Sequence, residues 1–236
     1  MKKSVSLKLI VFTLLLVTTN ITYSEDPEFK KGSEENSTVA GVASDASGWY
    51  SSAFGYNSLA TGSCSLAAGY KNTANGQNSS SVGWQNSADG TCASSFGYEN
   101  KASGDLSSAF GDGNTASGEY SSAFGNKNTA SGYNSSAFGY ENKASGIKSS
   151  AFGYNSLAAG YKNTASGYNS SASGNRNTAS GVDSSAFGSE YKVTGNSSGA
   201  FGVGSATWNS TTKVFDYGYI NEGKNSYMFG NYNKIA

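Results

Sequence analysis

The apolar and polar positions of this chain repeat with a period of seven residues. A glycine occurs at every seventh position from Gly41 to Gly202, and Gly223 and Gly230 return on the same count, so 26 of the 31 glycines share one phase. Alanine stands two positions before most of these glycines, and the residue between them is in general alternately apolar and polar. This phase indicates a structural repeat, because a flexible glycine–serine linker keeps no such register.

Two kinds of heptad alternate, so the complete repeat has 14 residues. "NSSAFG" at 134–139 exemplifies the type 1 heptad and "NKASG" at 142–146 the type 2 heptad. Helix is disfavoured, because each glycine costs about 1 kcal/mol in a helix interior and the surrounding serine, threonine and asparagine favour strands and turns. We therefore predict an all-β fold, a parallel β-roll or solenoid of 14-residue coils with one short strand of about five residues per heptad.

Side-chain alternation along these strands predicts which residues face the core. The alanine two positions before each glycine points inward, and the residue just before the glycine points outward. That outward residue is often phenylalanine in type 1 heptads and serine, threonine or asparagine in type 2 heptads. A soluble monomer does not leave an apolar stripe of this size in water, so we predict that a copy of the chain covers it. The predicted subunit-interface residues are Phe54, Phe96, Phe110, Phe124, Phe138 and Phe152.

Two further columns of side chains follow the same period. Aromatic residues follow the type 1 glycine and are possible ligand contacts, since rigid exposed aromatics anchor partners well, and stacking over the turns is the alternative. These residues are Tyr56, Tyr70, Trp84, Tyr98, Tyr140 and Tyr154. An asparagine column is expected to form a hydrogen-bonded ladder rather than a receptor site. It consists of Asn72, Asn86, Asn100, Asn114, Asn128 and Asn142.

The composition narrows the chemistry. The chain has no histidine, the commonest general base and metal ligand, so we expect no enzyme, no catalytic residues, no cofactor and no metal site. Sixteen basic and sixteen acidic residues balance without a polybasic run, so we expect neither nucleic-acid binding nor membrane contact by this segment.

The sequence divides into five segments. Residues 1–24 combine three lysines with a short apolar run at 9–17 and are predicted to be a secretory signal peptide, so the chain is exported. Residues 25–35 are charged, carry the only proline and are predicted to be a loose linker. Residues 36–202 form the β-roll, 203–222 an irregular insertion, and 223–236 a further, truncated repeat.

The alternating "NSSAFG" and "NKASG" heptads resemble the "NSVAIG"-type repeat in the head domains of trimeric autotransporter adhesins, the YadA-like family. The resemblance covers residues 36–236, with Phe201 and Phe229 in the place of the family's isoleucine. It implies a left-handed β-roll and a homotrimer with the hydrophobic faces at its centre. The stalk and the membrane anchor of a full adhesin are missing, so we expect a fragment or a truncated reading frame.

The same resemblance implies a function. The family's heads stand on bacterial outer membranes and bind host extracellular matrix or cell surfaces. We therefore expect an adhesin head at the cell surface if the chain is attached to an anchor, and otherwise a secreted or periplasmic protein. An ice- or surface-binding solenoid is the alternative, although Leu59, Lys101 and Lys143 interrupt the column of hydroxyl-bearing residues that it requires.

The repeat loses half a coil in one place. The segment "AFGYNSLATGSCSLAAGYKNTANG" at 53–76 returns at 151–167 as "AFGYNSLAAGYKNTASG", seven residues shorter. An even continuation would leave Phe187 and Phe201 on the polar face and forgo about 3–6 kcal/mol of burial, whereas a slightly longer loop costs under about 1 kcal/mol. We therefore predict a bulge or loop between Gly160 and Gly174 that returns both phenylalanines to the face of Phe152.

The two cysteines occupy the same place in coils that are two turns apart. Cys64 and Cys92 are separated by 28 residues, with Asn78 at the equivalent position between them. Two strand spacings put their Cα atoms about 9.5 Å apart, and a disulfide needs less than about 7 Å. We expect no disulfide between them within one chain.

Overall fold

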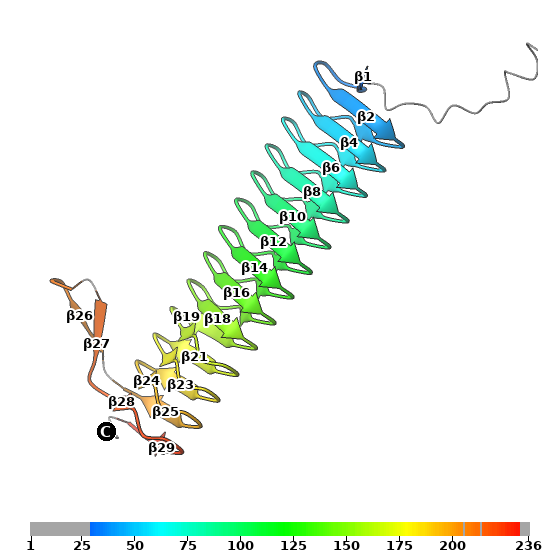
Figure 1. Cartoon of the computed structure of the whole chain (residues 1–236). Helices are drawn as coiled ribbons and strands as arrows, with labels where there is room; N and C mark the ends of the chain where they lie inside the picture. Colours follow the sequence, from blue (N-terminus) through cyan, green and yellow to red (C-terminus); the bar gives the residue numbers. More distant parts are fainter. Residues whose placement is uncertain (1–28, 205, 213, 232–236) are drawn as a thin grey trace, which may run out of the picture.

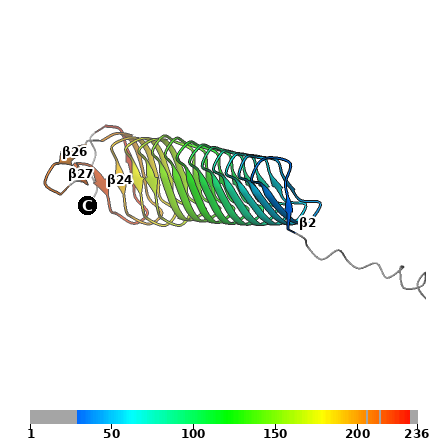
Figure 2. The same ribbon diagram turned by 90° about the horizontal axis from the view of Figure 1, so that it is seen from above.

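The computed structural model describes residues 29–204, 206–212 and 214–231. The predicted signal peptide at 1–24 lies outside the described residues. Within them the chain is all strand, without helix, and forms a solenoid of about 12 turns with coils about 14 residues apart. Figure 1 shows the coils stacked into a straight rod, and Figure 2 shows the same stack of coils from above. The predicted parallel β-solenoid of 14-residue coils is confirmed.

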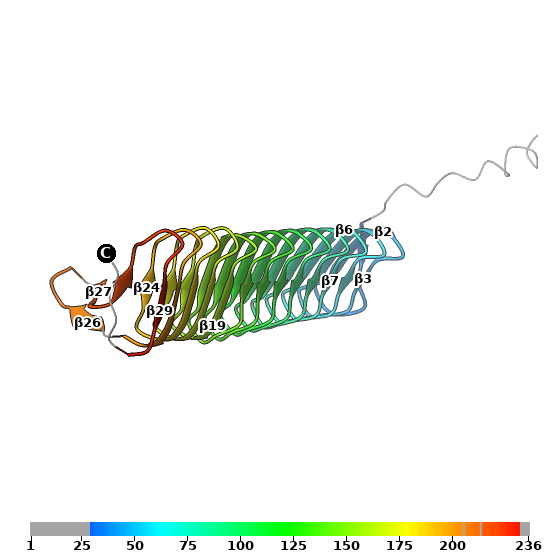
Figure 3. The same cartoon turned by 90° about the horizontal axis from the view of Figure 1, so that it is seen from below.

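Two sheets, parallel except for the first strand of sheet A, form the long faces of the rod. Sheet A contains β1 (Phe29–Lys31), β2 (Thr38–Val42), β4 (Ser52–Tyr56), β6 (Leu66–Tyr70), β8 (Ser80–Trp84), β10 (Ser94–Tyr98), β12 (Ser108–Asp112), β14 (Ser122–Asn126), β16 (Ser136–Tyr140), β18 (Ser150–Tyr154), β20 (Thr164–Ala165), β22 (Thr178–Ala179), β24 (Lys192–Val193) and β28 (Ile220–Asn221). Sheet B, on the other side (Figure 3), contains β3 (Asp45–Ala46), β5 (Leu59–Ala60), β7 (Thr73–Ala74), β9 (Ser87–Ala88), β11 (Lys101–Ala102), β13 (Thr115–Ala116), β15 (Thr129–Ala130), β17 (Lys143–Ala144), β19 (Leu157–Tyr161), β21 (Ser171–Asn175), β23 (Ser185–Ser189), β25 (Gly199–Val203) and β29 (Tyr227–Phe229).

The two types of heptad form strands of different length. Type 1 heptads give strands of up to five residues, such as β14, whereas type 2 heptads give strands of two residues, such as β15. Five residues per strand was therefore wrong for type 2 heptads. After the inward Ala130, the N–H groups of Ser131 and Gly132 both donate to the carbonyl of Ala144, at 2.9 and 3.3 Å. Sharing one acceptor ends the regular ladder and starts the turn.

Glycine is required where the coils approach most closely. Gly125 has a φ of 117°, and a Cβ atom built on it would lie 2.1 Å from the carbonyl oxygen of Gly139 in the next coil. The turn that follows places Lys127 in the left-handed region with a φ of 56°, and its N–H donates to the carbonyl of Asp112 at 2.8 Å. A side chain is accommodated at this second position but not at the glycine.

The core of the regular coils consists of small and amide side chains, and Tyr191, Val193 and Met228 join it only in the last coils. The alanines predicted to point inward, such as Ala109 and Ala123, are fully buried. The asparagine column is buried too, and the Asn114 amide donates to the carbonyls of Phe110 and Gly125 at 2.9 and 2.8 Å and to Oδ1 of Asn100 at 2.9 Å. The predicted hydrogen-bonded ladder is confirmed. It lies inside the roll, where it satisfies polar groups that would otherwise be buried without partners.

The predicted loop between Gly160 and Gly174 is wrong. After β18 the chain forms β19, a type 1 strand in sheet B, and then β20, a type 2 strand in sheet A. β18 pairs with β20 and β17 pairs with β19, so both sheets continue without a break while the heptad types exchange sheets. Phe152 therefore lies on sheet A, and Phe187 and Phe201 lie on sheet B.

The missing half coil is accommodated because both heptad types close with the same turn hydrogen bond. The N–H of Asn134, after a type 2 glycine, donates to the carbonyl of Glu119 at 2.8 Å, as that of Lys127 does to Asp112 after a type 1 glycine. At the exchange, the N–H of Lys162 in a type 1 turn therefore donates to the carbonyl of Ile147 in a type 2 turn, at 3.0 Å. Leaving the ladder would break several such bonds. In a single chain the outward phenylalanines of both sheets are partly exposed, so a loop would recover little burial.

The ends of the rod depart from the parallel repeat. β1 pairs antiparallel with β2 and covers the first edge of sheet A, although the sequence placed these residues in a loose linker. The predicted irregular insertion at 203–222 contains an antiparallel hairpin of β26 (Ala206–Asn209) and β27 (Val214–Tyr217). Phe201 then pairs with Phe229, 28 residues later, so the hairpin takes the place of one coil. Its Tyr217 hydroxyl donates to the carbonyl of Arg176 at 3.1 Å.

We predict that Gly125→Ala lowers the free energy of unfolding by more than about 3 kcal/mol, because it combines a disallowed φ with a clash against backbone. Gly113→Asn is the matched control. Gly113 has a φ of 65°, and a Cβ atom there would meet only Lys127 Cγ at 3.6 Å, so this variant should be as stable as the wild type or slightly more stable. Denaturant unfolding at fixed protein concentration measures both, and equal effects of the two substitutions would contradict the close-approach argument.

Candidate interaction surfaces

A ladder of phenylalanines runs along the outer face of sheet A. The ring centroids of Phe96, Phe110 and Phe124 are 4.9 Å apart in succession, and the rings are parallel within 10°. Phe138 and Phe152 extend the stack at 5.0 and 5.5 Å. Five of the six predicted interface residues thus form one continuous stack, which we call the sheet A ladder.

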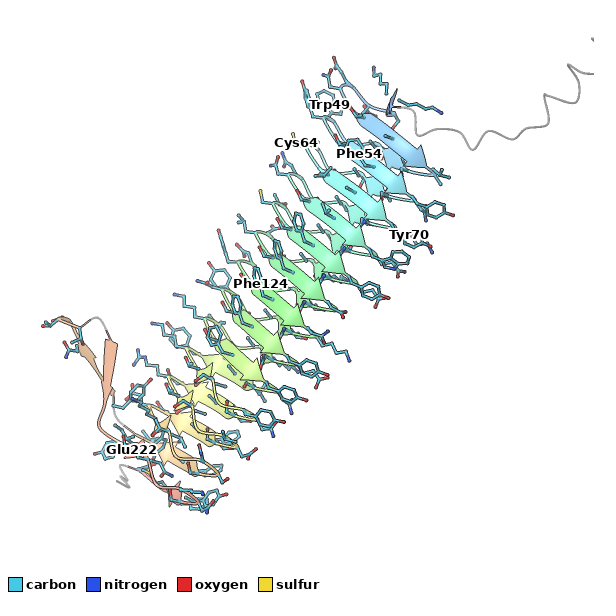
Figure 4. The ribbon with its side chains drawn as sticks, in the orientation of Figure 1. Trp49, Phe54, Cys64, Tyr70, Phe124 and Glu222 are labelled. Atoms are coloured by element: carbon cyan, nitrogen blue, oxygen red, sulfur yellow. The ribbon has the colours of Figure 1, made fainter. Side chains whose placement is uncertain are left out.

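The sixth predicted residue lies on the same face but outside this stack. Phe54 is aligned with Ala68, and Ala68 is aligned with Val82, so two smaller side chains separate it from Phe96. Figure 4 shows Phe54 and Phe124 over the same sheet. The position just before the glycine therefore stays apolar from β2 to β18, with most of its aromatic rings in the middle coils of the rod.

The turn aromatics stack on one another as well. Tyr56, Tyr70 and Trp84 follow at centroid distances of 5.3 and 3.9 Å, and Tyr98 continues the stack at 6.4 Å. Because each ring covers the face of the next, the stack presents mainly ring edges and hydroxyl groups along the edge of the rod where Figure 4 places Tyr70. This geometry favours the stacking alternative over broad contacts between ring faces and a ligand.

A second turn stack follows after an interruption. Asp112 and Asn126 occupy the aromatic position in the intervening coils, and the Asn126 amide donates to Asp112 at 3.0 Å. Tyr140 and Tyr154 then stack at 4.7 Å, and Tyr168 adds to Tyr154 at 4.7 Å. Tyr168 was not among the predicted turn aromatics, because it follows a type 2 glycine that reaches this edge only after the heptad types exchange sheets.

Two of these tyrosines have shifted acidity. Hydrogen bonding to the adjacent Glu99 carboxylate, together with its negative charge, raises the pKa of the Tyr98 phenol above its ordinary value of 10.0. Glu141 raises the pKa of Tyr140 in the same way. A raised pKa means that the fold favours the neutral phenol, so this contribution to stability is present below pH 10 and is lost as the pH rises through the raised pKa.

A second phenylalanine ladder lies on sheet B. Phe187 and Phe201 stack at 5.3 Å, and Phe201 and Phe229 stack at 5.2 Å, with interplanar angles below 10°. We call these three residues the sheet B ladder. Phe187 and Phe201 were predicted to lie on the face of Phe152, but the exchange of heptad types puts them on the opposite face.

Other candidate chemistry is sparse in the described part of the chain. Cys64 and Cys92 are free and exposed, and the amide of Asn78 lies 3.9 Å from the sulfur of Cys92. In the described ranges, no three histidine, cysteine, aspartate or glutamate side chains gather as a metal-binding group. The same residues contain no helix long and apolar enough to cross a membrane.

The stacked coils define the class of protein as a repetitive β-solenoid. Its aromatic side chains stand in columns on the outer faces and along the turns. The YadA head domain repeat matches residues 33–58, 60–86, 74–100, 102–128, 130–156, 154–177 and 165–190. These matches span more than half of the chain, which belongs to the YadA head repeat family. A search of curated proteins found no match.

We predict that Glu99→Gln lowers the pKa of Tyr98 towards the ordinary tyrosine value, because the variant loses the charged hydrogen-bond acceptor. Tyrosinate absorbance at high pH, recorded as a difference titration against the wild type, should show one tyrosine ionising at lower pH. Lys127→Gln, at the same turn position beside the non-aromatic Asn126, is the control and should leave the titration unchanged. An unaltered curve for Glu99→Gln would contradict the assigned cause.

Proposed function

We propose that this chain is the head of a bacterial surface adhesin, that it acts as a homotrimer, and that it binds host extracellular matrix or cell surfaces by multivalent contact without catalysis. The observation that carries the proposal is the sheet A ladder, a flat aromatic surface on a chain of the YadA head repeat family. The proposed subunit interface consists of Phe54, Phe96, Phe110, Phe124, Phe138 and Phe152.

The distribution of charge supports sheet A as the interface. On the outer face of sheet A from β2 to β18, the residues one and three positions before each glycine are all uncharged. Over the same coils sheet B carries Asp45, Asp89, Lys101 and Lys143 at the corresponding positions. A face without charge avoids the desolvation penalty that buried ions cost, and identical copies do not repel each other there.

The thin core gives a physical reason for assembly. Buried alanines contribute little apolar area, and a single stack of coils leaves its largest apolar side chains on the outside. Fully burying an exposed phenylalanine contributes about 1.5–3 kcal/mol. The ladder rings are already partly covered by their neighbours, so covering all five contributes less than five times this amount, which is still a substantial fraction of the net stability of a small domain. The polar sheet B of these coils and the turn stacks then face outwards, where repeated columns suit weak contacts made many times.

The alternative of an ice-binding surface has less support. Sheet B is flat, but its outward column through Leu59, Lys101 and Lys143 lacks a regular array of hydroxyl groups. The turn aromatics Tyr56, Tyr70, Trp84, Tyr98, Tyr140 and Tyr154 remain possible ligand contacts through their edges and hydroxyl groups.

We predict that Phe124→Ser weakens assembly and lowers the thermal midpoint strongly, because one substitution removes a ring from the middle of the ladder in every subunit. Ser131→Ala, on the polar sheet B, is the control and should behave as the wild type. Light scattering on the purified wild-type chain should give three times the mass of one chain. A stable folded monomer at micromolar concentration would refute the trimer.

The adhesive part of the proposal is tested with the same three proteins. On an array of purified matrix proteins, the wild type and Ser131→Ala should bind at least one component with similar apparent affinity. Phe124→Ser should bind that component at least about 100-fold more weakly if it dissociates into single chains, because avidity is lost. Equal binding by an assembled wild type and a dissociated variant would contradict multivalent contact.

A further inference from the structure

The sheet B ladder is an apolar surface that the proposed trimer does not use. Phe187 is 36% exposed and Phe229 is 69% exposed, and Phe201 lies half-buried between them. The ring of Tyr227 lies beside this stack, since a Cβ atom on Gly199 would meet its Cδ1 at 3.0 Å and the Phe201 ring at 3.1 Å. Four aromatic rings therefore gather on the last coils of sheet B.

The sheet B ladder lies on the opposite face of the rod from the sheet A ladder. Sheet A and sheet B both pass through the exchange of heptad types with their pairing intact, through β18–β20 and β17–β19. The two ladders are consequently held on opposite faces of one rigid rod. In an oligomer that packs sheet A at its centre, the sheet B ladder of every subunit points outwards.

After the exchange of heptad types, the uncharged outer face is that of sheet B, which also carries the phenylalanines. From β19 to β29, the outward residues of sheet B one and three positions before the glycine are all uncharged. They are Leu157, Ala159, Ser171, Ser173, Ser185, Phe187, Gly199, Phe201, Tyr227 and Phe229. Sheet A, which is uncharged at these positions up to β18, acquires Lys192 and Glu222 in its last coils. Both ladders thus have the composition of a surface that is covered by another molecule.

We propose that the sheet B ladder is a second self-association surface, through which oligomers joined at sheet A dock side by side on one another. A second copy fits because its rings repeat once per coil at the same 5.2–5.3 Å, so two ladders match along their length. The uncharged surroundings allow identical faces to meet without repulsion. This inference rests on the proposed oligomeric head.

The small area of the ladder determines when docking occurs. Four aromatic side chains bury far less than the roughly 800 Å² per partner of a stable interface, so two single chains do not stay together through this face alone. An oligomer presents the ladder several times, and when several ladders bind at once the apparent affinity rises although each single contact is unchanged. Docking therefore requires assembly at sheet A first.

Sedimentation velocity over a 100-fold range of concentration tests this proposal. The wild type should show the basic oligomer at low concentration and larger species as concentration rises. Phe201→Ser should retain the basic oligomer and require at least a tenfold higher concentration for larger species. Tyr120→Ser removes an exposed aromatic from a turn, where Ser197 shows that serine accepts the positive φ, and should behave as the wild type.

A second variant keeps every phenylalanine and changes only its face. Inserting Thr-Gly-Ser-Ser-Ser-Leu-Ala after Ala158 restores the missing heptad, with serine in place of cysteine, and returns Phe187, Phe201 and Phe229 to sheet A. This variant should form the basic oligomer but no larger species. Circular dichroism confirms that each variant is folded.

The outcomes separate the two proposals. A wild type that forms the basic oligomer but no larger species would overturn docking through sheet B and leave the proposed function intact. Larger species that persist in Phe201→Ser or in the insertion variant would also overturn it, because another surface would then join the oligomers. A wild type that stays monomeric at every concentration would overturn the proposed oligomeric head itself, and the inference with it.

Discussion

The hydrogen-bond ladder between successive coils is the interaction on which the rest of the structure depends. Strands 14 residues apart pair in parallel, and the asparagine ladder repeats the same step inside the roll, with Asn128 N–H donating to Asn114 Oδ1 at 3.0 Å. Glycines such as Gly125 permit the close stacking that this ladder needs. In the regular coils, apolar burial within one chain is limited to small side chains, so directional hydrogen bonds fix the coil, and the coil in turn decides on which face the outer columns lie.

The dominance of the hydrogen bonds between coils over the burial of outer side chains explains the exchange of heptad types. Removing seven residues preserves the glycine phase and the turns, so the hydrogen-bond ladder continues. As a consequence, the apolar column moves to the other sheet. The parity of the heptad count therefore decides which face of the rod is apolar. One chain carries two ladders on opposite faces for this reason, and the same backbone can present different surfaces along its length.

Much of the architecture could be predicted from the sequence because each coil repeats the same pattern of residues around its glycines. The inward alanines such as Ala123, the asparagine ladder and the common outward face of Phe96 to Phe152 all followed from position relative to the glycine. The loop near Gly160 was wrong because apolar burial on an outer face was weighed above backbone pairing, although that burial is gained only on assembly. The antiparallel β1, the hairpin of β26 and β27 and the stacking of Tyr168 on Tyr154 depend on contacts between segments that no local period encodes.

The dominance of the ladder over the apolar stripe is tested most directly by hydrogen–deuterium exchange in the segment from Tyr154 to Ser170. Its amides include Leu157, Lys162 and Asn169, which donate to the carbonyls of Ser170, Ile147 and Tyr154 at 2.9, 3.0 and 3.0 Å. An unbroken ladder predicts that peptides from this segment exchange as slowly as those from Asn126 to Asn142 in the regular coils. Rapid exchange confined to residues 160–174 would show that a heptad leaves the ladder there, and would contradict the account.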